Sequence, residues 1–261
     1  METVTSADGT PIAYERRGNG PPLVLVHGGA AASAIDWEPV LPQLAEHFTV
    51  YAMNRRGRGE SGDADTYTVE REFEDVAAVV DSIIDPAHLL GHSFGAVCAL
   101  EAALRTDNIA TLVLYEPALA DEEGEIFPEG LLQRIDDRLA ADDVEEALTV
   151  LVRSVGYSDE DIDRIRADEF WRVRLEATPT ITRELRALND YRFEPDRFSD
   201  LTVPVGLVTG SESPALFHTS TATLDEGLPN SRIITLPGQT HEAVTGAPDV
   251  FVEKVASFLR E

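Results

Sequence analysis

A serine flanked by two glycines, Ser93, stands where an apolar run meets a helix-forming run. Residues 89–95 read Leu-Leu-Gly-His-Ser-Phe-Gly, a GxSxG pattern. Such a pattern holds a serine hydroxyl exposed on a sharp turn from strand to helix. Gly91 and Gly95 suit the turn because a Cβ atom at either place would collide with the neighbouring backbone. The pattern predicts nucleophilic catalysis by Ser93, which needs a histidine base, an acid and backbone donors for an oxyanion.

The elements that must position this serine follow from short, continuously apolar runs, which predict buried strands. These runs are residues 22–27, 48–53, 88–90, 111–115, 203–209 and 231–236. Apolar residues at helical spacing predict helices between most of them, over residues 36–46, 70–84, 95–105 and 248–260. The first 20 residues alternate and turn at Asp8-Gly9, which predicts a hairpin. The alternation of strands and helices indicates an α/β fold with a mainly parallel sheet.

The interval from residue 121 to residue 195 has a different character. It contains acidic amphipathic helical patterns, among them 131–139 and 144–152, and no convincing strand. We therefore predict a core made of residues 1–120 and 196–261, with residues 121–195 inserted as a helical cap. The stretch around His218 shows no pattern that assigns it to a helix or a strand.

The charge balance is strongly acidic. The chain has 48 acidic and 21 basic residues in 261, a net charge of −27, and Lys254 is its single lysine. Dense surface carboxylates repel one another weakly at molar salt, where the Debye length shrinks to about 3 Å, and they keep a protein hydrated. The composition therefore suggests adaptation to high salt. It also argues against a nucleic-acid partner, because no basic patch is available to neutralise phosphates.

Cysteine usage and the N-terminus bear on the cellular compartment. Cys98 is the only cysteine, which excludes an internal disulfide and a cysteine-based metal site, and its apolar surroundings predict a core position. The first residues carry neither a basic segment nor an apolar one, and no stretch approaches the ~18 apolar residues that span a bilayer. We expect a soluble, cytoplasmic protein without a membrane partner.

Four motifs in order resemble those of the α/β-hydrolase superfamily. They are His27-Gly28-Gly29 after one strand, the arginine- and glycine-bearing loop 56–62 after the next, the elbow at 91–95, and a late His241. The resemblance covers nearly the whole chain except the cap. It implies a mostly parallel, eight-stranded sheet flanked by helices, with a helical cap insertion.

The resemblance also implies roles for several residues. Ser93 would attack a carbonyl carbon, and His241, which follows the last predicted strand, would be the base. The backbone amides of Phe94 and Gly29 would form the oxyanion hole, with Ala30 as the alternative to Gly29. His27 and His92 would have structural roles rather than carry protons.

The acid of the triad is where this chain departs from the commonest family pattern. Ser213 stands at the expected aspartate position, and a serine cannot carry the charge that stabilises an imidazolium. Glu116 is the first candidate, because it follows the strand at 111–115 directly and so lies at the carboxyl end of the sheet. Glu212 is the alternative.

Cofactor and metal sites are not predicted. The loop 57–62 satisfies GxGxxG, but a polar turn follows it instead of a helix that could receive a pyrophosphate, so the loop is expected to be structural. Residues 241–245 do not form the HExxH motif, and the other histidines are scattered. No metal or cofactor is therefore expected.

The function that these residues indicate is hydrolysis of a carboxylic ester or related acyl bond of a small molecule, through a serine acyl-enzyme. Dehalogenases and epoxide hydrolases of the superfamily are disfavoured because they carry aspartate in place of Ser93. Serine-triad lyases, perhydrolases and non-enzymatic ligand receptors on the same fold stay open as alternatives. The natural substrate and the oligomeric state are not indicated.

Overall fold

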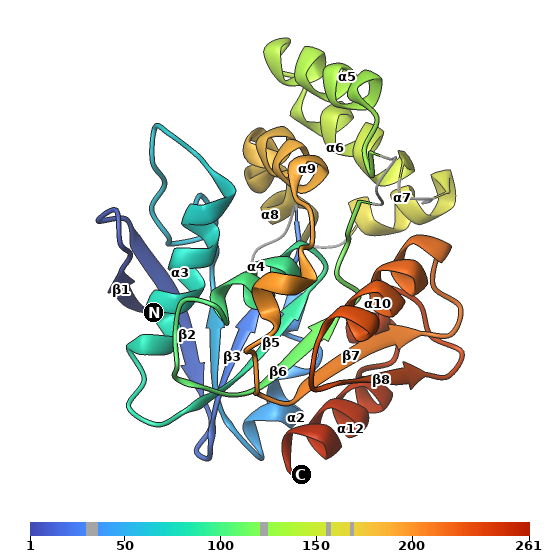
Figure 1. Ribbon diagram of the computed structural model, residues 1–261. Helices are drawn as coiled ribbons and strands as arrows, with labels where there is room; N and C mark the ends of the chain where they lie inside the picture. The colour runs from blue at the N-terminus through green and yellow to red at the C-terminus, as the bar shows by residue number, and fades with distance from the viewer. Residues whose placement is uncertain (30–35, 121–124, 155–157, 168–169) are drawn as a thin grey trace.

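The computed structural model describes residues 1–29, 36–120, 125–154, 158–167 and 170–261 (Figure 1). Within these residues the strands form one eight-stranded sheet in the order β1-β2-β4-β3-β5-β6-β7-β8. The strands are β1 (Glu2–Thr5), β2 (Pro11–Arg17), β3 (Pro22–Val26), β4 (Thr49–Met53), β5 (Ala87–His92), β6 (Ile109–Tyr115), β7 (Val205–Gly210) and β8 (Ser231–Leu236). The first two strands form the predicted hairpin and β2 pairs antiparallel with β4, while the other neighbours are parallel. The predicted mostly parallel α/β sheet is confirmed.

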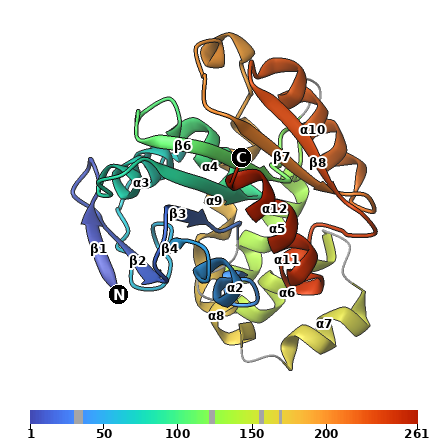
Figure 2. The same cartoon turned by 90° about the horizontal axis from the view of Figure 1, so that it is seen from below.

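Helices cover both faces of this sheet because its central strands are apolar on both sides. One face carries α3 (Val69–Asp81), α4 (Phe94–Ala102) and α10 (Ala215–Gly227). The other carries α2 (Leu41–Ala45) and α12 (Pro248–Leu259), which lie side by side in the view from below (Figure 2). The short helix α11 (Ala243–Gly246) precedes α12.

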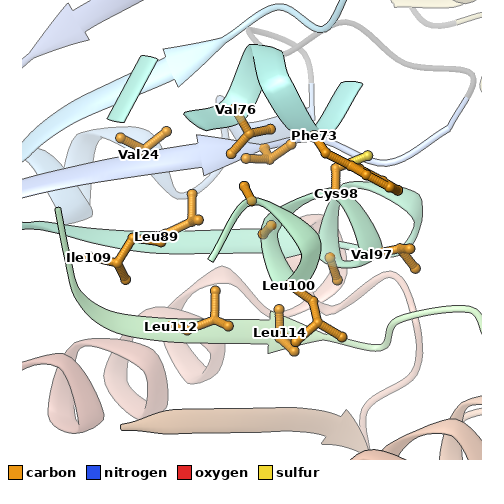
Figure 3. Packing of buried hydrophobic residues seen from close by; sticks show 14 of the residues in the cluster. Val24, Phe73, Val76, Leu89, Val97, Cys98, Leu100, Ile109, Leu112 and Leu114 are labelled. Carbon is orange, nitrogen blue, oxygen red and sulfur yellow. The ribbon is translucent and has the colours of Figure 1, made fainter. Parts of the chain in front are cut away.

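The apolar cluster under α3 and α4 fixes where β5 ends and α4 begins. Figure 3 shows Phe73 of α3 and Leu100 of α4 among strand residues such as Leu89 and Leu114. Cys98 is fully buried in this cluster, so its predicted core position is confirmed. The turn that joins β5 to α4 is therefore held between two buried elements.

One segment differs from its predicted structure, and another, left unassigned, is helical. The helix expected over 36–46 contains turn residues at 38–40, and α2 is only Leu41–Ala45. Pro39 and Pro42 lack the amide hydrogens that a longer helix would need. We did not predict α10 from the sequence; its run of serine and threonine has weak helix propensity, and packing on β7 and β8 stabilises it instead.

The interval 121–195 contains helices and no strand in its described residues. They are α5 (Glu129–Ala140), α6 (Val144–Ser154), α7 (Asp159–Arg166), α8 (Phe170–Ala177), α9 (Ile181–Asp190) and the 3-10 helix η1 (Thr178–Thr180), followed by a second 3-10 helix, η2 (Pro195–Phe198). The helices α5 to α9 lie above the sheet in Figure 1 and have an apolar cluster of their own that includes Leu148, Trp171 and Ile181. Leu188 of α9 belongs instead to the main cluster, so α9 packs against both parts. In the described part of the chain, every helix is too short or too polar to cross a bilayer.

Candidate active site

Ser93 lies at the turn from β5 to α4 in a backbone conformation that side chains rarely adopt. Its φ is 54° and its ψ is −119°. A Cβ on Gly95 would lie 2.3 Å from the carbonyl oxygen of His27, and one on Gly91 would lie 2.3 Å from that of Gly95. The predicted need for glycine at both positions is confirmed. Positive φ at a non-glycine residue costs about 1–3 kcal/mol and is typical of functional sites.

Glu116 and His241 come from distant parts of the chain and meet beside this turn. Glu116 follows β6, its φ is 46°, and its side chain is fully buried. Its Oε2 lies 2.7 Å from His241 Nδ1, and its Oε1 accepts hydrogen bonds from Thr209 Oγ1 at 3.1 Å and Gly210 N at 2.8 Å. An ionised carboxylate only accepts hydrogen bonds, so Nδ1 of His241 carries its proton and Nε2 is left as the basic nitrogen.

The electrostatic surroundings keep Glu116 ionised. Burial by itself would raise the pKa of this carboxyl, but the hydrogen bond with His241, the nearby Ser213 hydroxyl and the hydrogen bond from the Gly210 amide outweigh burial and hold the pKa below its usual value. An ionised carboxylate beside an imidazole can stabilise the imidazolium that forms when Nε2 accepts a proton. The pair thus has the polarity required of a base and its orienting acid.

Aromatic residues hold the histidine ring and its loop. Phe217 of α10 stacks on His241 with ring centroids 4.1 Å apart, and His92 lies 4.5 Å away on the same ring. Burial and the neighbouring His241 hold the pKa of His92 well below its usual value, so His92 packs as a neutral ring. The hydroxyl of Tyr115 donates to the carbonyl of Thr240 at 2.6 Å and accepts from the Ala243 amide at 3.1 Å. We did not identify Phe217 or Tyr115 from the sequence, although Tyr115 directly precedes Glu116.

Removing the Tyr115 hydroxyl should destabilise the protein. In Tyr115→Phe, two backbone groups that flank His241, the Thr240 carbonyl and the Ala243 amide, each lose one partner and keep only the 3.2 Å hydrogen bond that joins them. The expected cost is about 0.5–1.5 kcal/mol in the free energy of unfolding. Chemical denaturation measures it. Tyr51→Phe is the matched control, because no hydrogen bond to the Tyr51 hydroxyl occurs among the described residues. Equal stability of the two variants would contradict the role assigned to the Tyr115 hydroxyl.

Glu212 and Ser213, the other two positions considered for the acid, do not form a hydrogen bond with His241. Glu212 is exposed, and its Oε1 accepts a 3.3 Å hydrogen bond from the adjacent Ser211 hydroxyl instead of contacting His241. Ser213 is buried, and its Oγ would lie 2.8 Å from a Cβ placed on Gly210, the residue whose amide binds Glu116. Its hydroxyl contributes to lowering the pKa of Glu116, but it meets no described partner at normal hydrogen-bond geometry. The structure brings Glu116, and not Glu212, to the histidine.

The two predicted oxyanion donors lie in the two segments that meet at the nucleophile, the start of α4 and the loop after β3. Phe94 is the first residue of α4, so its amide is among those that a helix leaves without an internal partner. Gly28 brings its loop against the elbow, since a Cβ on Gly28 would lie 3.3 Å from Ser93 Cβ; exposed Gly29 follows it. The alternative donor, Ala30, lies outside the described residues.

The neighbouring His27 shapes the same loop. It is fully buried, its Nε2 accepts from the Arg55 amide at 3.1 Å, and its Nδ1 lies 2.9 Å from the Gly28 carbonyl oxygen. Because Nε2 accepts, the ring proton is on Nδ1 and is donated to Gly28. Burial, and then the positive charge of Arg55, hold the pKa of His27 well below its usual value. A neutral, doubly hydrogen-bonded imidazole is a structural element.

The glycine-rich loop after β4 is also structural. Gly57 and Gly59 have φ values of 69° and 49°, and the Ser61 hydroxyl donates to the Asn54 carbonyl while accepting from the Ala13 amide at 2.8 Å. These contacts tie the loop to β2. Within the described ranges there is no group of three or more His, Cys, Asp or Glu residues that could hold a metal ion.

The fold and these motifs agree with a comparison against protein families. The model of the alpha/beta hydrolase family matches residues 23–254, which include the elbow, both glutamates and His241. The chain belongs to the α/β-hydrolase family.

Individual relatives support this assignment. The chain is 28% identical over 262 residues to a pimeloyl-[acyl-carrier protein] methyl ester esterase from Aeromonas hydrophila, a match covering 95% of this chain and 99% of the relative. Among solved structures, an alpha/beta hydrolase from Sphaerobacter thermophilus superposes with a TM-score of 0.86 at 35% identity, covering 99% of this chain and 100% of the neighbour. An esterase from Rhodococcus sp. superposes with a TM-score of 0.79 at 26% identity, covering 100% and 98%.

Proposed function

We propose that this protein hydrolyses a carboxylic ester or a related acyl bond of a small molecule, with Ser93, His241 and Glu116 as its catalytic triad. The observation that carries the proposal is the 2.7 Å hydrogen bond between His241 Nδ1 and the buried carboxylate of Glu116, beside a serine on a strained turn. The Aeromonas relative and the Rhodococcus neighbour are both esterases by name, which supports an ester substrate.

In the first half of the reaction, His241 Nε2 takes the proton of the Ser93 hydroxyl as its oxygen attacks the substrate carbonyl carbon. The carbonyl oxygen becomes negative in the tetrahedral intermediate and is stabilised by the amides of Gly29 and Phe94. The imidazolium then gives its proton to the departing alcohol, and the acyl group stays on Ser93.

In the second half, water replaces the alcohol. His241 removes a proton from the water, its oxygen attacks the acyl carbon, and collapse of the second intermediate returns the proton to Ser93 and releases the acid. Glu116 stabilises the imidazolium in both halves. The helices within 121–195 act as a cap that selects the acyl group.

The proposal is tested with nitrophenyl esters of graded acyl length in molar salt. We expect each mole of ester hydrolysed to release one mole of nitrophenol and one mole of acid. The rate should differ among acyl lengths. Product analysis separates this outcome from a lyase or a perhydrolase. The absence of both turnover and organophosphate labelling at Ser93 would contradict the proposal and favour a ligand receptor.

The acidic composition leads us to propose that the protein is adapted to high salt. We expect its melting temperature to rise when potassium chloride is raised from about 0.1 M to about 2 M, because the Debye length falls from about 10 Å to roughly 2–3 Å and the repulsion among surface carboxylates weakens. Calorimetry at several salt concentrations measures this rise. A melting temperature independent of salt would show that the charge of −27 is no adaptation of this kind.

A further inference from the structure

Arg55, two residues after β4, is fully buried and contacts both sides of the predicted oxyanion hole. Its Nη1 donates to the Gly28 carbonyl oxygen at 2.8 Å, and its guanidinium carbon lies 4.4 Å from the centre of the Phe94 ring. We propose that Arg55 is a positioning residue for the oxyanion hole and that Glu184 of α9 couples the cap to it. This inference rests on the proposed function.

The geometry of a peptide bond gives the contact with Gly28 its importance. The carbonyl of Gly28 and the amide N–H of Gly29 belong to the same planar trans peptide unit and point in opposite directions. Two donors, Arg55 Nη1 and His27 Nδ1, hold the carbonyl at 2.8 and 2.9 Å. Holding the carbonyl on one side therefore aims the Gly29 amide at the other, where an oxyanion donor is needed.

Buried carboxylates hold the guanidinium in this orientation. Its Nε and Nη2 donate to the two oxygens of Glu72 at 3.1 and 2.8 Å, and Nη2 also lies 3.1 Å from Glu184 Oε2. The other oxygen of Glu184 accepts from Arg58. All four of these charged side chains have exposed fractions of 2% or less. Each buried charge is costly without its partner, so the network permits little rotation of Arg55.

The network joins the two parts of the molecule. Arg55, Arg58 and Glu72 belong to the sheet-bearing part, whereas Glu184 is on α9, in the interval 121–195. Glu184 also approaches the loop itself, since its Oε2 would lie 3.9 Å from a Cβ placed on Gly29. Displacement of α9 would therefore disturb the ion pair that aims the Gly29 amide.

Arg56 offers a control for the role of buried charge alone. It is as buried as Arg55 and forms a two-bond ion pair with Asp75, at 2.7 Å for each bond, plus a contact with Asp8. Among the residues that the structure describes, its hydrogen bonds reach only Asp75, Asp8 and the Arg71 carbonyl, and none reaches the Gly28–Gly29 loop or the elbow. A variant that lacks the Arg56–Asp75 pair loses comparable buried charge without losing the proposed positioning.

The test compares Arg55→Met/Glu72→Leu with Arg56→Met/Asp75→Leu. Each double variant removes a whole ion pair, which a protein tolerates far better than loss of one partner. Titration with an organophosphonate counts folded sites, and kcat is expressed per titrated site. We expect kcat to fall about 10- to 100-fold in the Arg55 variant with KM changed less than about threefold, since loss of one oxyanion donor typically costs 10²–10³. The Arg56 variant should keep kcat per site within about threefold.

A second measurement separates positioning from folding. A trifluoromethyl ketone forms a tetrahedral adduct with an oxyanion, so its Ki should rise in the Arg55 variant by the factor by which kcat/KM falls. Glu184→Gln should show a smaller change in the same direction. Wild-type values of kcat per site and Ki in the Arg55 variant would overturn the inference.

The inference can also fail separately from the proposed function. If the wild-type protein hydrolysed no ester and bound no ketone, the proposed function would be wrong, and crystal structures of the two double variants would then decide about Arg55. A reoriented Gly28–Gly29 peptide in the Arg55 variant alone supports the inference. An unchanged peptide in both variants overturns it.

Discussion

Ser93→Ala should lower turnover of an acyl ester by about 10⁵- to 10⁶-fold, because a methyl group cannot form the acyl-enzyme. The residual rate would come from substrate binding and the oxyanion donors alone. Labelling by an organophosphate should disappear as well. The measurement is initial rates on the best substrate of the ester panel, with active sites counted in the wild type.

The control for this change is Ser199→Ala, which removes an exposed serine hydroxyl whose one hydrogen bond within the described residues is to the Asp196 carbonyl. Its turnover should equal that of the wild type. Retention of more than about one hundredth of the activity by Ser93→Ala would contradict the role of Ser93 as nucleophile, since such residues cost far more when removed.

The strain at this position provides a related expectation. Because φ at Ser93 is 54°, Ser93→Gly should be more stable than Ser93→Ala by about 1 kcal/mol or more, while being equally inactive. Denaturant unfolding of the two variants measures the difference. A more stable glycine variant would indicate that the serine is held there for chemistry at a cost in stability.

Glu116→Gln should lower turnover by about 10⁴-fold, by analogy with the corresponding amide substitution in serine proteases. The amide keeps the shape of the side chain and can still accept from Thr209 and Gly210, but it carries no charge to stabilise the imidazolium. Glu212→Gln is the matched control, because Glu212 is exposed and contacts Ser211. A large loss in Glu212→Gln and none in Glu116→Gln would reverse the assignment of the acid.

Ser213 allows a rescue of the same variant. Ser213→Asp in the Glu116→Gln background places a carboxylate beside the Gly210 turn. We expect the turnover of this double variant to be at least tenfold higher than that of Glu116→Gln alone. In the wild-type background the same substitution should impair the enzyme, because two buried carboxylates would share one site and the pKa of one would rise. Absence of rescue would show that Ser213 cannot present an acid to His241.

The regular elements were predictable from local pattern. Apolar runs predicted β3 and β5, and helical spacing predicted α3 and α12. In each of these elements the buried residues form a regular apolar pattern along the sequence. The helix α10 was not predictable, since its serine- and threonine-rich sequence becomes helical through packing on β7 and β8. The turn at residues 38–40 interrupts the helix that apolar spacing predicts over 36–46, because Pro39 and Pro42 lack amide hydrogens.

In the candidate site, too, some residues were predictable from a local motif and others depend on tertiary contacts. The motif around Ser93 is contiguous, so its turn, its glycines and the start of α4 could be predicted from neighbouring residues. The sequence favoured Glu116 as the partner of His241 but left Glu212 open, because each follows a strand whose carboxyl end lies at the same edge of the sheet. Tyr115, which binds the backbone on both sides of His241, and Arg55, which binds the Gly28 carbonyl, belong to no motif that would have singled them out in the sequence.

The amino-acid sequence by itself determined the family, the mainly parallel sheet, the elbow at Ser93 and the acidic surface charge. Each depends on local order or on composition. The tertiary structure decided which carboxylate meets His241 Nδ1, at 2.7 Å, and which arginine reaches the Gly28 carbonyl, at 2.8 Å. Those contacts join residues 125 and 27 positions apart, and such distances depend on strand order and helix packing, which no local pattern records.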